Sequence, residues 1–143
     1  MKLLDANILL YAVNEDAPLH GAAKSWVDAT LSGSETIGLT WTVLLAFLRL
    51  STRAVIFPRP LAPDEAFDIV ESWLEQPCVT VLQPTDRHFR ILRDLLEPLG
   101  TAGNLTSDAH LAAIALEHDA ELCSCDADFA RFAGVRWVNP IAP

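Results

Sequence analysis

The alternating pattern of this chain begins with the stretch LLDANILLYAV at residues 3–13. The apolar pair Leu3 and Leu4 predicts a short buried strand, and the run from Ile8 to Val13 predicts a helix. Asp5 lies between them, where the strand ends and the chain turns. Because an acid directly behind a buried strand is costly without a partner, we expect Asp5 to have a functional role.

The same strand-to-helix order recurs along the rest of the chain. Apolar residues at helical spacing predict helices, and short β-prone runs between turn residues predict strands. We expect Phe67 on the inner face of its helix. The expected strands after the first are 36–40, 79–82, 121–124 and 135–138, and the expected helices are 18–31, 43–54, 64–76, 86–96, 109–118 and 126–132.

Alternating strands and helices predict an α/β fold, a three-layer α/β/α sandwich with a central, mostly parallel sheet. A length of 143 residues predicts a single domain over residues 1–143. The 51% share of hydrophobic residues is enough for a core without a disulfide or metal. In such folds, functional sites lie at the carboxyl ends of the strands.

Charge and cysteine content exclude several classes of protein. The formal charge of −9 argues against passive adhesion to nucleic acid or anionic lipid. Three cysteines, an odd number without a second metal-binding pair, argue against a disulfide framework and structural zinc, and favour the cytoplasm. Neither an export signal nor a membrane-spanning run is expected, because the most apolar stretch, 41–48, is too short.

Three acids far apart in the sequence follow predicted strands or open predicted helices: Asp5, Asp108 and Asp126. They could converge at one end of the sheet, where clustered carboxylates would require a hard cation such as Mg²⁺ or Mn²⁺. Such a cation favours phosphodiester hydrolysis. The alternative remains open that Asp108 is only a helix-terminal charge and that Asp126 and Asp128 are only helix caps.

Three segments together resemble a PIN-domain ribonuclease of the VapC toxin type. They are LLDANILLY at residues 3–11, NLTSDAHLA at 104–112 and SCDADFARF at 124–132. Each motif is weak alone, but their order and intervals make a fairly specific set, and the resemblance covers essentially the whole chain.

The resemblance implies a Mg²⁺-dependent endoribonuclease that cuts structured RNA, such as transfer or ribosomal RNA. It also implies a homodimer, and inhibition by a cognate, VapB-like antitoxin. In this resemblance Asp5, Asp108 and Asp126 are metal ligands, Asp128 is an accessory acid, and Asn7 and Ser124 support the site.

One position departs from the family pattern. The family usually has a Glu four residues before the Leu-Arg pair of the second helix, and this chain has Leu44 there. A replacement would come from Asp128, from the Glu15 and Asp16 pair, or from water. A second hypothesis follows, in which the chain is a catalytically weakened PIN-like module that binds RNA or protein.

The basic residues and histidines carry weaker signals. Arg49 and Arg53 are RNA-binding candidates because the resemblance places them near the mouth of the site. The arginines of 87–93 could contact phosphate, but a solvated face paired with nearby acids is the simpler interpretation. The four histidines are interpreted as isolated packing or surface residues.

Overall fold

The structure of the chain, a computed structural model, describes residues 1–142. Its elements are β1 (Lys2–Leu4), α1 (Ala6–Val13), α2 (His20–Leu31), β2 (Ile37–Leu39), α3 (Trp41–Ser51), α4 (Pro63–Leu74), β3 (Val79–Val81), α5 (His88–Leu96), η1 (Glu97–Leu99), η2 (Gly103–Leu105), α6 (Thr106–Glu117), β4 (Glu121–Cys123), η3 (Ala127–Arg131) and β5 (Trp137–Val138).

The five strands form one sheet in the order β3-β2-β1-β4-β5, and every neighbouring pair is parallel. Leu3 and Leu4 of β1 are completely buried, as expected of a central strand covered on both faces. Gly38 of β2 allows close packing, because a Cβ there would lie 2.5 Å from Cδ1 of Leu82. The predicted α/β/α sandwich with a parallel sheet is confirmed.

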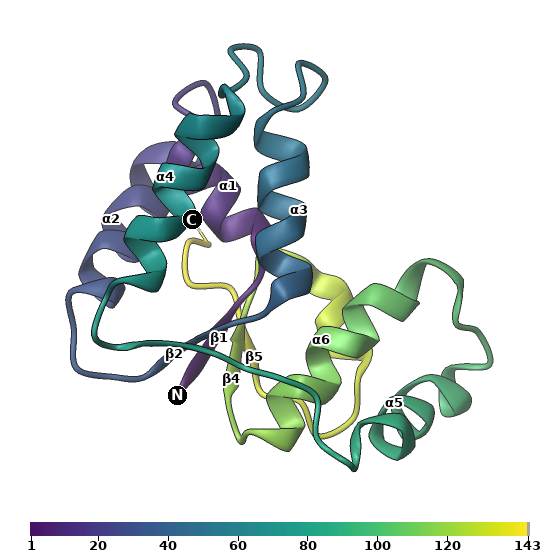
Figure 1. Ribbon diagram of the computed structural model, residues 1–143. Helices are drawn as coiled ribbons and strands as arrows, with labels where there is room; N and C mark the ends of the chain where they lie inside the picture. Colours follow the sequence, from purple (N-terminus) through teal and green to yellow (C-terminus); the bar gives the residue numbers. More distant parts are fainter. Residues whose placement is uncertain (143) are drawn as a thin grey trace.

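The helices form two groups, one over each face of the sheet (Figure 1). On one face α1 contacts α2 and α3, and α3 contacts α4, whereas α5 packs on α6 on the other face. This division follows from right-handed crossovers, since the chain moves from β1 outward to β3 and then returns to the other side of β1. No helix in the described residues is long and apolar enough to cross a bilayer.

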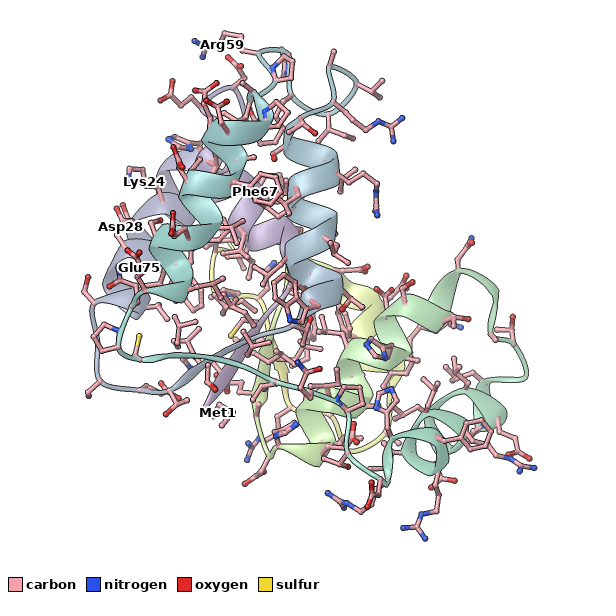
Figure 2. All side chains as sticks on the ribbon, viewed as in Figure 1. Met1, Lys24, Asp28, Arg59, Phe67 and Glu75 are labelled. Carbon is pink, nitrogen blue, oxygen red and sulfur yellow. The ribbon has the colours of Figure 1, made fainter. Side chains whose placement is uncertain are left out.

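One aromatic residue departs from the prediction. Phe67 on α4 is 60% exposed, and its side chain is labelled in Figure 2. The buried stripe of α4 is instead formed by Ala66, Val70 and Trp73, because a helix on a sheet buries only one narrow face.

The strand order reverses between β1 and β4. These two strands pair directly, with Leu4 opposite Cys123, so the residues that follow them meet at the same edge of the sheet. Asp5 follows β1, and Ser124 and Asp126 follow β4. Open parallel sheets form their ligand sites at such a reversal, outside the carboxyl ends of the strands.

Candidate active site

Asp5 connects β1 to α1 and caps the helix. Its backbone is extended, and its Oδ1 accepts a hydrogen bond of 2.7 Å from the N–H of Ala6. Its Oδ2 accepts a second bond of 2.7 Å, donated by the hydroxyl of Ser124 across the sheet. The carboxylate is therefore held from two directions, which restricts its rotation.

Asn7 and Ser124 tie the β1 and β4 edges together. Asn7 Nδ2 donates to Ser124 Oγ at 3.1 Å, and its Oδ1 accepts from the backbone N–H of Cys125 at 3.2 Å. Ser124 is completely buried, and its Oγ also accepts from the N–H of Asp126 at 3.0 Å. These bonds connect Asp5 to Asp126 through a single hydroxyl.

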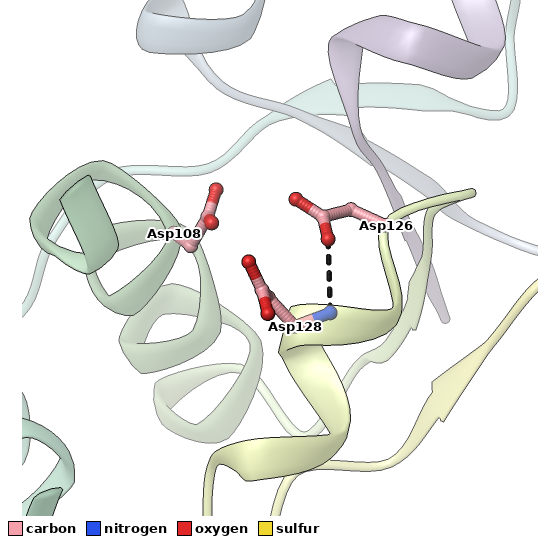
Figure 3. Close-up of side chains that lie close together, drawn as sticks. All are labelled: Asp108, Asp126 and Asp128. Carbon is pink, nitrogen blue, oxygen red and sulfur yellow. Dashed lines mark hydrogen bonds between the residues drawn. The ribbon is translucent and has the colours of Figure 1, made fainter.

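Three carboxylates gather where α6 and η3 begin. Each of Asp108, Asp126 and Asp128 has an oxygen within 4.8 Å of an oxygen from both others. In Figure 3 the Asp108 side chain points from α6 toward the two η3 acids. Asp126 Oδ1 accepts from the N–H of Asp128 at 2.9 Å, which fixes the turn that brings both acids forward.

The carboxylates of the site repel one another. The pKa of Asp108 is raised to about 6, mainly by burial and then by the charges of Asp126, Asp5 and Asp128, in that order. Burial is also the main cause of a raised pKa at Asp5, where the charge of Asp126 adds to it and the bonds from Ser124 and Ala6 oppose it. Such repulsion indicates a place where positive charge would be stabilised.

The donor set fits a hard divalent cation. Asp108, Asp126 and Asp128 offer only carboxylate oxygens, the ligands that Mg²⁺ and Mn²⁺ prefer, and contain no thiolate or imidazole. Asp5 lies outside the group whose oxygens meet within 4.8 Å. Its charge nevertheless raises the pKa of Asp108, and the hydroxyl of Ser124 connects its carboxylate to the backbone of Asp126. The Asp128 carboxylate is a full member of this group of three, together with Asp108 and Asp126.

The position of the missing family Glu is apolar in this chain. Leu44 of α3 is completely buried in the core. Among the proposed replacements, Glu15 and Asp16 form ion pairs with Arg59 at 3.6 and 3.2 Å. Of the acids considered as substitutes, only Asp128 belongs to the carboxylate cluster.

The arginines divide into paired and unpaired groups. Within residues 1–142, the guanidinium groups of Arg49 and Arg53 form no ion pair. Arg49 lines a cavity next to the amino-terminal turn of α6. On α5, Arg93 pairs with Glu97 at 2.8 Å, as the solvated-face interpretation expects.

The interpretation of the histidines as isolated is wrong for two of them. His88 Nε2 lies 2.8 Å from His110 Nδ1, and His88 Nδ1 lies 2.6 Å from Glu117 Oε2. The pKa of His110 is lowered, mainly by burial and then by its His88 neighbour, while Glu117 opposes this. Only the packing of α5 on α6 joins these residues, so no motif in the sequence could have indicated the contact.

Comparisons of the sequence identify its relatives. Residues 2–135 match the family model of the PIN domain. The chain is 49% identical to ribonuclease VapC37 of Mycobacterium tuberculosis, and the match covers 99% of each protein. It is 45% identical to ribonuclease VapC33 of the same organism, again over 99% of each.

Solved structures with low sequence identity share the fold. The complex VapBC2 from Rickettsia felis, bound to a DNA fragment from its promoter, contains a chain that matches with a TM-score of 0.69 at 17% identity, covering 96% of this chain and 97% of that one. Mycobacterium tuberculosis VapC20, a toxin that cleaves the sarcin-ricin loop, matches with a TM-score of 0.65 at 20% identity, covering 95% and 99%.

Proposed function

The chain belongs to the PIN-domain family and is an endoribonuclease toxin of the VapC type, and we propose that its carboxylate cluster holds the metal ion for RNA hydrolysis. The observation that supports this proposal most directly is that carboxylate oxygens of Asp108, Asp126 and Asp128 lie within 4.8 Å of one another. Asp126 follows β4, which pairs with β1 in the sheet. No other arrangement in the described residues brings three acids so close. The mutual repulsion of these acids supports a cation as their partner.

The proposed ligands are Asp5, Asp108 and Asp126, with Asp128 as a further ligand that supplements the set in the absence of a Glu at Leu44. The metal is Mg²⁺, for which Mn²⁺ can substitute, because all the donors are carboxylate oxygens. When bound, such an ion neutralises charge on phosphate oxygens and lowers the pKa of water. The acids themselves hold the ion at the sheet edge, where a phosphodiester can approach.

The supporting residues act by positioning the acids. Ser124 donates to Asp5 and accepts from the backbone of Asp126, so it sets the spacing between the two carboxylates. Asn7 holds Ser124 and the β4 turn in place. Arg49 and Arg53 have no carboxylate partner in the described part of the chain, and we propose that they contact RNA phosphates.

The proposed partners are an RNA and an antitoxin. We propose a structured RNA, transfer or ribosomal, as substrate, supported by the ribonuclease names of the relatives and by the sarcin-ricin specificity of VapC20. A VapB-like antitoxin is supported by the VapBC complexes among the similar structures, and a basic segment in it would complement the charge of −9. A homodimer is also proposed, as is action in the cytoplasm, supported by three free cysteines.

The experiment that tests this function is a titration of the antitoxin-free protein with Mg²⁺ and Mn²⁺, followed by incubation with total RNA. We expect the wild type to bind metal and cut RNA, and Asp5→Asn to lose both while it melts at a similar temperature. Wild-type protein that does not bind metal and does not cut RNA would support the alternative of a weakened binding module. Full activity of Asp5→Asn with a matching melting curve would remove Asp5 from the ligand set.

Metal binding is expected to depend on pH. A proton on Asp108 competes with the cation, and the metal-free pKa of that carboxyl is about 6. The apparent affinity for Mg²⁺ should therefore be constant above about pH 7 and fall about tenfold for each pH unit below 6. Calorimetric titrations at pH 5, 6 and 7.5 check this, and an affinity that does not change over this range contradicts the role of Asp108.

A further inference from the structure

A cavity of about 550 Å³ is lined by residues of α3, α5 and α6. Its lining includes Leu45, Ala46 and Arg49 of α3, Leu92 of α5, and Ser107 and His110 of α6. Ser107 directly precedes Asp108 in the sequence, so the lining includes the chain neighbour of one cluster acid. A volume of this size is typical of sites for small organic groups.

His110 is held in this cavity by a chain of hydrogen bonds that starts at a buried carboxylate. The Glu117 side chain is fully buried, and its Oε1 accepts from the backbone N–H and the hydroxyl of Thr85 at 2.8 and 2.6 Å. Its Oε2 lies 2.6 Å from His88 Nδ1. A carboxylate can only accept, so His88 Nδ1 is the protonated nitrogen of that ring.

This arrangement determines what His110 offers to a ligand. In the form of His88 that carries one proton, on Nδ1, the Nε2 atom has a lone pair and accepts from His110 Nδ1 at 2.8 Å. With His88 in that form, the proton of neutral His110 resides on Nδ1, and Nε2 of His110 is an acceptor. Among residues 1–142, Nε2 of His110 has no hydrogen-bond partner.

The remaining walls fit a flat ring that has polar edges. Leu45, Ala46 and Leu92 provide apolar surface for the faces of such a ring. Arg49 lines the cavity and forms no ion pair with any residue that the structure describes, so its charge is available to a phosphate. A nucleotide combines these features: an aromatic base, N–H groups on its edge and a phosphate.

We propose that this cavity binds the base of an RNA nucleotide next to the scissile phosphate, with Nε2 of His110 accepting a hydrogen bond from an N–H on the base edge. Arg49 contacts a phosphate of the same strand. This inference rests on the proposed ribonuclease function and names the part of the site that selects sequence. His88, Glu117 and Thr85 are positioning residues, because they act on the RNA only through His110.

The main test measures base preference during cleavage. Wild-type enzyme with Mg²⁺ is incubated with an RNA library of random sequence, and the bases around each cut are counted. We expect a preference at one position next to the cut, reduced about tenfold or more in His110→Phe, which keeps a flat ring and removes the acceptor. His118→Phe is the matched control, because His118 lies at the other end of α6 and bonds to the carbonyl of Gln83.

A second pair of variants fills the cavity without touching the hydrogen-bond chain. Leu45→Trp places a large ring in the lining, whereas Val55→Trp changes an aliphatic residue that is 84% exposed and lies outside it. Leu45→Trp should raise KM for RNA at least fivefold and leave Mg²⁺ affinity unchanged, and Val55→Trp should change neither. Titration with the four nucleoside 5′-monophosphates should shift the His110 ring signals in NMR spectra to different extents.

The outcomes separate this inference from the function on which it rests. If the wild type binds metal and cuts RNA but His110→Phe and Leu45→Trp keep its base preference and KM, the base site is wrong and the ribonuclease function stands. If Leu45→Trp instead changes the oligomeric state with an unchanged preference, a second copy covers the cavity and the base site is also wrong. Wild type that neither binds metal nor cuts RNA overturns both.

Discussion

Asp108→Asn is expected to lower the rate of RNA cleavage at least a hundredfold and, at the same time, to make the folded protein more stable. Asp108 forms no hydrogen bond or ion pair through its side chain within residues 1–142, so its removal breaks no structural contact. It stands in a cluster where burial and three other acids disfavour its charge. We therefore expect this carboxylate to serve the reaction rather than stability.

The sign and size of the stability change follow from the pKa. A value of about 6 in the folded state, against 3.8 as the ordinary value, means that ionised Asp108 destabilises the fold at neutral pH. Because the carboxyl is partly solvated, we expect Asp108→Asn to gain about 1–2 kcal/mol at pH 7.5, below the full equivalent of the shift. The gain should shrink as the pH falls through 6 and vanish below about 4.

Urea unfolding of metal-free protein at pH 7.5, 6 and 4, together with a cleavage assay at saturating Mg²⁺, measures both effects. Asp94→Asn is a suitable control, because Asp94 is an exposed acid of α5. That variant should keep both cleavage and stability. An Asp108→Asn protein that cuts RNA at the wild-type rate, or that is less stable at pH 7.5, would contradict the proposed role.

Leu44→Glu is expected to remove most or all of the stability of the fold. Leu44 is 0% exposed, and the replacement loses its apolar contacts and buries a charge without a partner. We expect a loss of about 4 kcal/mol or more, a large share of the 5–15 kcal/mol typical of a domain. The sequence alone left open whether a Glu here would restore a metal ligand, and burial in the core favours destabilisation.

The next residue of the same helix provides the control. Leu45 is 56% exposed, so Leu45→Glu should change the free energy of unfolding by less than about 0.5 kcal/mol. Circular dichroism and thermal melts of both variants separate burial from any general effect of an acid in α3. A Leu44→Glu protein that melts like the wild type and binds Mg²⁺ more tightly would show that this position is a vacant ligand site.

Local patterns were sufficient for much of the fold. The break between the apolar pair 3–4 and the apolar run 8–13 predicted β1, the turn at Asp5 and α1, because strand and helix place their apolar residues at different periods. The alternation of such units predicted a parallel sheet. The same periodicity was wrong for Phe67, since it cannot show how wide a stripe of a helix its neighbours cover.

The candidate site was accessible from the sequence only in outline. Asp5, Asp108 and Asp126 could be singled out because each stands at the end of a strand or the start of a helix. Asp128 joins Asp108 and Asp126 in the cluster because of the turn at the start of η3, in which the N–H of Asp128 donates to Asp126. Whether these acids bind the metal stays a prediction.

The sequence by itself determined the order of strands and helices, the parallel sheet and the family of this chain, because periodicity and short motifs are properties of neighbouring residues. Tertiary structure alone decided the register of β1 against β4, which sets Asp5 beside Ser124, and the packing of α5 on α6, which joins His88 to His110. These contacts join residues 119 and 22 positions apart. Side chains so distant in the chain meet only when the whole core has formed, so no local pattern could encode their contact.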